Sequence, residues 1–403
     1  MKIIWIINHA AVTPEYPGGT RHFELGKRFA ENGYQVVIFA SSVLYQNPTK
    51  NILKAGIHYE IEELFDHFKF VWISTTTYKV NNWRRLYGML VFSVKTVYYG
   101  RKFVKKKSIL RPDIIIGSTV HPFAPLSAKY LSKKFCSDYI FEIRDLWPQS
   151  FIDMGIWKRT SFISIFFKQI EKINIQKAKT IVFLSPKTKD YIEENYGMEK
   201  LNLCYIPNGA DVSYSEGLNN TTGLFDKEFF NIVFTGAIIQ TNRIDIICEA
   251  AKSIIDYSQI RIIIIGDGNI KELLINKYQE NQNIVWMNSI PKKEIPLVLN
   301  NADALILVQG NVAWGSSNKL YDYLAAGKPI ISSVWVPHND IVSRINAGYS
   351  VEPENSKQLA DKIIKIFKLP KVERVKMGRN AIKYVKKFHD WDLLSQNFMK
   401  LFQ

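Results

Sequence analysis

Short runs of aliphatic and β-branched residues alternate with longer stretches of helical periodicity, and the pattern occurs in both halves of the chain. Runs such as 2–7, 35–40 and 261–265 are apolar almost throughout, as strands are when helices cover both faces of a parallel sheet. The stretch 21–32 instead places its apolar residues near one stripe of a helix. Alternation of this kind predicts an α/β fold with doubly wound, Rossmann-like parallel sheets.

Chain length decides how many such sheets to expect. The 403 residues exceed what one compact core usually holds. The turn-rich segment IPNGAD at 206–211, followed by polar residues at 213–222, predicts a domain boundary. We therefore expect a first domain over 1–205 and a second over 206–385, which face a central cleft. Ligands of open parallel sheets bind at the carboxyl ends of the strands, and here these ends border that cleft.

The formal net charge of +16 suits a nucleic acid, an anionic membrane surface or a phosphorylated substrate as partner. Basic residues are interleaved with aromatic ones at 83–87, 98–103 and 157–167, and three lysines follow at 105–107. Such helices suit a lipid headgroup interface. The alternative is a solvated basic face above ordinary core aromatics, and the sequence does not choose between the two.

Three scattered cysteines, Cys136, Cys204 and Cys248, form no CxxC motif, which favours a reducing compartment over a disulfide scaffold or a zinc site. The apolar run at the N-terminus is too short for a signal peptide and is interpreted as the first strand. No apolar run has the length needed to span a bilayer. The protein is therefore expected to be soluble or peripheral to a membrane.

Two glycine-containing loops suit phosphate binding. Gly18 and Gly19 lie between the first strand and a helix, where the backbone can approach a ligand and free amides face it. The second loop precedes a helix that begins near residue 318, and its candidate ligand-binding residues are Ser317, Asn318, Lys319, Leu320 and Asp322. A lysine is disfavoured at a helix N-terminus unless an anion binds there. Asp322 lies one turn after Asn318, so both share a face, and its carboxylate could accept hydrogen bonds from ribose hydroxyls.

Further candidates follow other strands. Gly236 ends one strand, and Arg243 lies at the start of the next helix, where its planar guanidinium could hold a diphosphate. His121 follows a strand and precedes a helix, so it could bind a donor hydroxyl, although a structural role is the alternative. Arg144 and Asp145 also follow a strand, and either orient an acceptor hydroxyl or pair to shape the loop.

Taken together, these segments resemble the GT-B glycosyltransferases of family 4, a retaining group. The matching segments are PGGTRHFELGKRFAENGYQVVIFA at 17–40, FLSP at 183–186, IPNGAD at 206–211, IIIIGDG at 262–268, NADALI at 301–306, KLYDYLAAGKPII at 319–331 and GYSVEPEN at 348–355. The resemblance implies that residues 386–403 include a helix that crosses back to the first domain. It also implies transfer without a metal or another cofactor.

The resemblance assigns roles to single residues. The family's phosphate-binding lysine lies seven positions after the strand-end glycine, which gives Arg243, while the arginine that many members carry next to this glycine is Ala237 here. Asp322 matches the second of two glutamates eight positions apart and would bind the ribose. The first glutamate, which contacts the donor sugar, corresponds to Trp314, so this carboxylate is lost. His121 matches the family histidine near the sugar.

We therefore expect an enzyme in which His121, Arg243 and Lys319 assist the transfer and Arg144 and Asp145 lie on the acceptor side. The segments at 144–148 and 318–323 resemble a branch that builds bacterial O-antigen and capsule repeats, some members of which transfer N-acetyl-L-fucosamine. The donor would be a UDP-sugar and the acceptor a polyprenyl-diphosphate-linked sugar. The enzyme would act in the cytoplasm, peripherally at the inner face of the cell membrane, and would not bind nucleic acid.

Two alternatives stay open at this point. A UDP-sugar 2-epimerase has the same two-domain architecture and would need acid–base groups around the donor C2 but no acceptor. A nonenzymatic basic protein that binds nucleic acid or membrane would show salt-dependent binding to polyanions and no nucleotide affinity.

Overall fold

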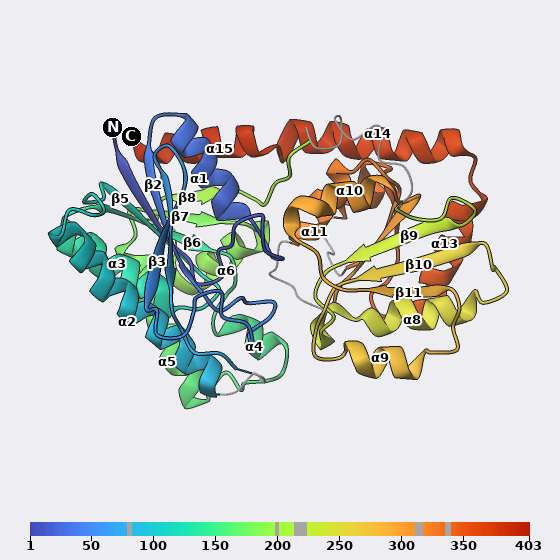
Figure 1. The fold of residues 1–403 in the computed structure, drawn as a ribbon, viewed down its shortest axis with the longest axis horizontal. Helices are drawn as coiled ribbons and strands as arrows, with labels where there is room; N and C mark the ends of the chain where they lie inside the picture. The colour runs from blue at the N-terminus through green and yellow to red at the C-terminus, as the bar shows by residue number, and fades with distance from the viewer. Residues whose placement is uncertain (79–82, 198–200, 213–223, 311–316, 335–339) are drawn as a thin grey trace.

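The computed structural model describes residues 1–78, 83–197, 201–212, 224–310, 317–334 and 340–403. Two lobes lie side by side, each built around one sheet, and the last helices of the chain run along both lobes (Figure 1). The prediction of two parallel-sheet α/β domains is confirmed. None of the described helices is both long and apolar enough to cross a bilayer.

The first lobe contains an eight-stranded sheet. Its strands are β1 (Ile3–Ile7), β2 (Gln35–Ser41), β3 (Tyr59–Phe65), β4 (Phe68–Ile73), β5 (Ile114–Ser118), β6 (Asp138–Ile143), β7 (Thr180–Phe183) and β8 (Leu203–Tyr205). They are ordered β3-β4-β2-β1-β5-β6-β7-β8. All neighbours are parallel except β3, which pairs antiparallel with β4 at one edge.

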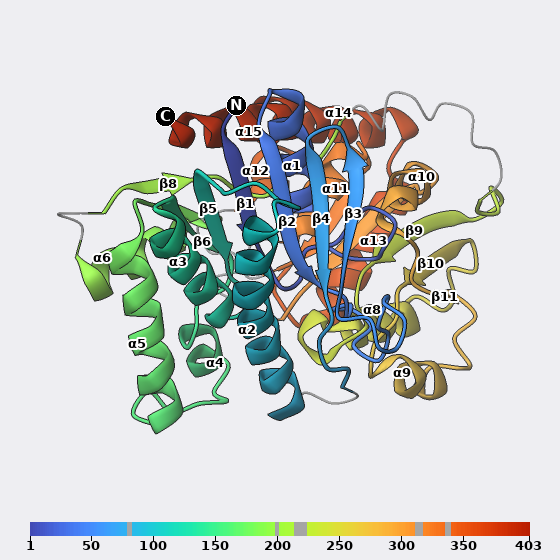
Figure 2. The ribbon, with the colours of Figure 1, turned by 60° about the vertical axis from the view of Figure 1, so that its left-hand side comes forward.

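Helices cover both faces of this sheet. They are α1 (Arg21–Glu31), α2 (Trp83–Lys105), α3 (Phe123–Phe135), α4 (Gln149–Asp153), α5 (Phe162–Lys177) and α6 (Pro186–Tyr196). Phe23 and Phe29 of α1 enter the core on one face, whereas Phe103 of α2 and Leu131 of α3 enter the core on the other. Figure 2 shows α2, α3 and α5 in a row on this second face.

The second lobe repeats the plan with a six-stranded, all-parallel sheet ordered β11-β10-β9-β12-β13-β14. Its strands are β9 (Phe230–Thr235), β10 (Ile260–Ile265), β11 (Ile284–Met287), β12 (Ala304–Val308), β13 (Ile330–Ser333) and β14 (Gly348–Ser350). Its helices are η1 (Gln240–Asn242), α8 (Ile244–Ser253), α9 (Lys271–Lys277), η2 (Lys292–Glu294), α10 (Ile295–Asn300), α11 (Asn318–Ala325), α12 (Ile341–Arg344), α13 (Ser356–Lys368) and α14 (Lys371–Phe388). The arrowheads of β9 and β10 point toward the first lobe (Figure 1), so the loops that follow these strands face it.

The chain crosses between the lobes twice. After β8 it enters the second lobe, where Ala210 is already part of the core. At the far end, α14 buries Ala381 and Val385 in the second lobe, and then α15 (Trp391–Met399) and η3 (Lys400–Phe402) return to the first lobe. Trp391, Leu394, Phe398 and Phe402 are buried in the first lobe's core. The last turns of the chain are therefore structural parts of its first lobe.

Sequence analysis did not predict three of the described strands, and there is a physical reason for each omission. β3 reads YEIEELF with half-buried and exposed positions in alternation, because it is an edge strand and is not covered on both faces. β8 and β14 contain only three residues each, too few to show any periodicity.

Arg28 joins three separate segments near the crossing points. Its guanidinium bonds Glu24 of α1 at 2.9 Å, Asp211 after the first crossing at 3.3 Å, and Asp392 of α15.

Replacing Arg28 by alanine leaves a nearly buried Glu24 without its cation, so we expect a loss of about 2 kcal/mol in the free energy of unfolding. Urea denaturation measures it. The exposed Lys27–Glu31 pair on the same helix supplies the control, since Lys27→Ala should cost no more than about 0.5 kcal/mol; equal losses in the two variants would contradict the role of Arg28.

Candidate active site

The helices α1 and α11 begin opposite each other across the crevice between the lobes. A Cβ at Gly19, just before α1, would lie 2.5 Å from Nδ2 of Asn318 and 3.7 Å from a guanidinium nitrogen of Arg144. A side chain at this position would therefore displace the Asn318 amide. The two predicted loops, Gly18–Gly19 and Ser317–Lys319, therefore lie together at one place. The first amides of both helices begin there, and such amides attract anions.

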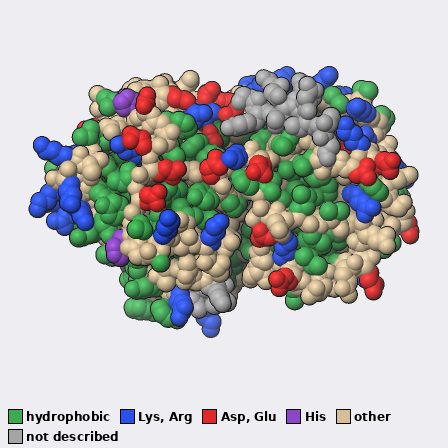
Figure 3. Space-filling view, in the orientation of Figure 1, with side chains coloured by type: hydrophobic (Ala, Val, Ile, Leu, Met, Phe, Trp, Pro, Cys, Tyr) green, Lys and Arg blue, Asp and Glu red, His purple; other side chains and the backbone are tan. Residues whose placement is uncertain are grey.

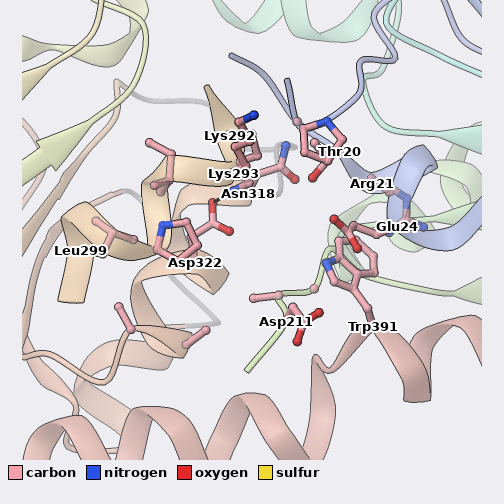
Figure 4. Close-up of a pocket in the computed structure, with 18 of the residues that line it drawn as sticks. Thr20, Arg21, Glu24, Asp211, Lys292, Lys293, Leu299, Asn318, Asp322 and Trp391 are labelled. Carbon is pink, nitrogen blue, oxygen red and sulfur yellow. Dashed lines mark hydrogen bonds and ion pairs between the residues drawn. The ribbon is translucent and has the colours of Figure 1, made fainter. Parts of the chain in front are cut away.

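Contacts beside this point hold the lobes together. The amide of Lys293 in η2 donates to the carbonyl of Pro14 at 3.1 Å, and its ammonium pairs with Glu15 at 2.5 Å. The next lysine, Lys292, pairs with Asp322. Figure 4 shows the cavity here, with Asn318 and Asp322 on one wall and Thr20, Arg21 and Glu24 of the first lobe opposite.

Asp322 and Asn318 line the same cavity from α11, as expected for residues one turn apart. The carboxylate of Asp322 is therefore on the crevice side of the helix, where a ribose could reach it. Without a ligand, its Oδ2 accepts a hydrogen bond from Nζ of Lys292. A ribose would have to share or displace this lysine, which sequence analysis did not identify.

Lys319 points back toward the second sheet. Its Nζ lies 4.8 Å from the ring centroid of Phe234 and 3.1 Å from where a Cβ of Gly236 would be. Burial lowers the pKa of this ammonium to about 8. Among the described residues no carboxylate forms an ion pair with it, although buried cations are normally paired. An anion bound at Gly236 and the start of α11 would supply the missing charge.

Arg243, in contrast, is already paired. It follows β9 through η1, and its guanidinium bonds Asp245 at 2.9 Å and also pairs with Glu354. These two carboxylates raise its pKa above the ordinary range of arginine. Arg243 could hold a diphosphate only by exchanging at least one of these partners, so its predicted role has a cost that the sequence did not reveal.

Two buried histidines lie side by side at the carboxyl ends of β1 and β5. His121 Nδ1 accepts from the amides of Phe123 and Ala124 at 3.3 Å each, so its proton is on Nε2, which has no partner among the described residues. The His9 ring lies 4.9 Å from that of His121, edge to face, and in the part of the chain that the structure describes neither of its nitrogens has a hydrogen-bond partner. Burial and Arg85 lower the pKa of His9 to about 3, and burial and His9 lower the pKa of His121 well below its usual value. Both rings are thus neutral at physiological pH.

Arg144 and Asp145 lie on the first-lobe side of the crevice but form no ion pair with each other. Oγ1 of Thr119 accepts from both of their amides, at 2.8 and 3.1 Å, and this shapes the loop in place of the expected pairing. The Arg144 Nε is buried and has no partner within the described ranges, and Asp145 is exposed. The Arg144 Nε is therefore a hydrogen-bond donor that the described residues leave unsatisfied on this side of the crevice.

Sequence profiles match both lobes. The profile described as Glycosyltransferase Family 4 matches residues 18–214, and the one described as Glycosyl transferases group 1 matches residues 220–384. The chain belongs to the family 4 glycosyltransferases. The enzymes of this family use nucleotide sugars. Gly19 lies in the first matched region and Asn318 in the second, so the two loops that meet in the crevice come from both regions. No curated protein matches the chain significantly.

Solved glycosyltransferase structures share the fold over the full length. Sucrose-phosphate synthase from Thermosynechococcus elongatus is 15% identical, with a TM-score of 0.75 over 100% of this chain and 98% of its own. WaaG, a glycosyltransferase involved in lipopolysaccharide biosynthesis, is 14% identical, with a TM-score of 0.67 over 99% of each chain. Anabaena HepE in complex with UDP and glucose is 12% identical, with a TM-score of 0.66 over 100% of this chain and 99% of its own. The expected GT-B fold is confirmed.

Other predicted residues of this family 4 glycosyltransferase have simpler positions. Ser317 is the N-cap residue of α11, but its side chain accepts no hydrogen bond from the helix. Leu320, in the first turn, is half-buried and packs against the second lobe's core. Trp314 lies outside the described residues.

Sequence analysis did not assign a role to Glu142, a fully buried carboxylate. Glu142 at the end of β6 accepts from Arg21 at 2.9 Å and from Ser118 at 2.5 Å, and it contacts His22 at 2.6 Å. Burial opposes its ionisation, yet Arg21 and His22 hold its pKa well below the usual range. Arg21 also donates to the carbonyls of Ile206 and Pro207 at 2.9 and 2.5 Å. The available signal was a glutamate among the apolar residues that follow the exposed Asp138 in the strand DYIFEI.

Proposed function

We propose that this glycosyltransferase transfers a sugar, with retention, from a UDP-sugar to a polyprenyl-diphosphate-linked acceptor at the inner face of a bacterial cell membrane, in the assembly of capsule or O-antigen. N-acetyl-L-fucosamine is the first sugar to test, because the segments at 144–148 and 318–323 resemble transferases of that sugar. The absence of a transmembrane helix among the described residues agrees with peripheral attachment. The UDP bound to HepE and the role of WaaG in lipopolysaccharide biosynthesis support the donor and the pathway by similarity of fold.

One observation carries the proposal: Lys319 is a half-buried cation without a described carboxylate partner, beside Gly236 and the start of α11. In transfer from a nucleotide sugar, the bond between the sugar and the diphosphate breaks and negative charge develops on the leaving diphosphate. A fixed cation and free helix amides stabilise this charge more in the transition state than in the ground state. We assign this role to Lys319, with Arg243 as the second cation.

The first lobe would supply uncharged contacts. His121 has a free Nε2–H beside the neutral ring of His9, which suits a hydrogen bond to a sugar hydroxyl. A protonated imidazole would repel the positive charge that develops on the sugar, and burial prevents this protonation. Arg144 and Asp145 would meet the acceptor from the same edge.

A panel of nucleotides and nucleotide sugars in a thermal-shift assay tests the donor class. We expect UDP and UDP-sugars to raise the Tm more than ADP or GDP at the same concentration. Greater stabilisation by a purine nucleotide would show that the donor is not a UDP-sugar. Incubation with a UDP-sugar alone then distinguishes the 2-epimerase, which would convert the donor without an acceptor.

Asp322→Asn tests the ribose contact. The amide accepts hydrogen bonds more weakly than the carboxylate, so we expect the KM for the donor to rise about 10- to 100-fold with a smaller change in kcat. Lys292→Ala is the matched control, because it removes the partner of Asp322 and leaves the carboxylate available. Its KM should stay equal or fall. A rise in KM in the lysine variant, with none in the asparagine variant, would assign the ribose contact to Lys292 instead.

A further inference from the structure

The outer face of α2 is an apolar stripe that is exposed in the described part of the chain. Its exposed members recur every three or four residues along the helix, which places them on one side. They are Trp83, Tyr87, Leu90, Val94 and Tyr98. Val94 is 67% exposed although it lies in the middle of a 23-residue helix, so the stripe is not an effect of frayed ends.

A second apolar surface lies at the start of α5. Phe162 is 86% exposed, the largest exposed fraction of any large hydrophobic side chain in the described residues, and Ile165 and Phe166 follow it. Met89 on the inner face of α2 and Phe167 and Ile170 on that of α5 belong to one buried cluster, which also contains Phe123 of α3. In Figure 2 the two helices flank α3 on the same side of the first lobe, so their outer faces form one surface.

The charge of this surface has one sign. The helices α2, α3 and α5 together contain twelve lysine and arginine side chains and one carboxylate, Glu171. Glu171 is buried against Lys168, Tyr191 and Tyr196. No exposed acidic side chain therefore offsets the cations on these three helices. Figure 3 shows lysine and arginine side chains at the outer end of the first lobe, among hydrophobic ones.

We propose that the α2–α3–α5 face of the first lobe is the surface that docks on an anionic lipid bilayer, with the stripe of α2 and Phe162 entering the headgroup region. Apolar and aromatic side chains bury their surface at the boundary of the acyl chains, while flanking lysines meet lipid phosphates. The exposed valine, leucine and phenylalanine side chains favour a bilayer over a nucleic acid, which would bind through phosphate contacts and base stacking.

The helix α14 shows that charge alone does not define this surface. It carries seven lysine and arginine side chains and one glutamate, so this single helix is also strongly basic. Between Val375 and Phe388, however, it exposes no large hydrophobic side chain. It therefore provides a control surface that is rich in cations and has no apolar stripe.

Sedimentation with vesicles tests the assignment on the full chain, without donor or acceptor. We expect binding to phosphatidylcholine vesicles that contain phosphatidylglycerol to be at least about tenfold tighter than binding to pure phosphatidylcholine. The triple variant Val94→Ser, Tyr98→Ser, Phe162→Ser should bind about tenfold more weakly or worse. The control Leu273→Ser, Val372→Ser removes two equally exposed apolar side chains from the second lobe and should bind as the wild type does.

Two matched sets of lysine variants test the contribution of charge to vesicle binding. Replacing Lys133, Lys134 and Lys172 by glutamine should weaken binding about a hundredfold, whereas the same change at Lys371, Lys376 and Lys383 of α14 should have little effect. Equal losses from the two sets, unchanged binding of the serine triple variant, or tighter binding to a duplex RNA than to the anionic vesicles would each overturn the proposal. The choice of a bilayer as partner rests on the proposed function, but donor hydrolysis in solution tests that function separately. If the protein hydrolyses the donor but does not bind anionic vesicles, the proposed docking surface is wrong and the proposed function is not affected.

Discussion

Lys319→Met is expected to lower kcat/KM for the sugar donor about 10²- to 10³-fold, the loss typical of removing one group that stabilises transition-state charge. The lysine lies in the first turn of α11, against Gly236 and Phe234. Methionine keeps most of the packing and removes the charge. Steady-state kinetics with donor hydrolysis as the readout measures the loss without a defined acceptor.

Stability should change in the opposite direction. Because burial lowers the pKa of Lys319 to about 8, its charged form disfavours folding, and this cost disappears as the pH rises from about 8 toward the unfolded value of 10.5. Lys319→Met should therefore fold at least as stably as the wild type at pH 7. A loss of activity together with a loss of stability would instead indicate a structural role for the lysine.

The pH dependence of donor binding gives a second readout of the same group. A bound diphosphate favours the ammonium, so above about pH 8 binding must take up a proton and affinity should fall by up to about tenfold per pH unit. In Lys319→Arg the affinity should not change between pH 8 and 10. The control is Lys328→Met at the other end of α11, where burial also lowers the pKa; this variant should retain donor turnover.

Glu142→Ala is expected to cost about 3–5 kcal/mol in the free energy of unfolding, because it leaves the buried guanidinium of Arg21 without its carboxylate. His22 and Ser118 lose the same partner. Urea denaturation followed by tryptophan fluorescence measures the loss. The exposed Glu31, paired with Lys27 at 3.9 Å, provides the control, and its replacement by alanine should cost no more than about 0.5 kcal/mol.

Acid should produce the same effect gradually. The folded-state pKa of Glu142 lies well below its usual value, so its contribution is complete above the unfolded pKa and is lost as the pH falls toward the folded one. The Glu142→Ala variant should lack this part of the acid dependence. A loss below about 1 kcal/mol at pH 7, or an unchanged acid profile, would show that Arg21 is held by the carbonyls of Ile206 and Pro207 alone.

The sequence was informative where a signal was local. Continuous apolar runs identified the central strands, and glycines next to helix starts identified the loops that meet at Gly19 and Asn318. It was uninformative where the partner is distant. Glu354 is 111 positions from Arg243, and nothing near the arginine in sequence indicates that pairing. His9 and Lys292 gain their importance only from His121 and Asp322, which other elements place beside them.

The return of the chain to its first lobe affects how the protein can form during synthesis. Trp391, Leu394, Phe398 and Phe402 belong to the core that β1 and α1 begin. That core stays incomplete until these residues have left the ribosome, after the whole second lobe has been made. Domains that emerge first usually fold first. Here the first lobe cannot complete its core before the C-terminal residues are synthesised. Until then its apolar face is exposed, and this is the part of the nascent chain that a chaperone would have to cover.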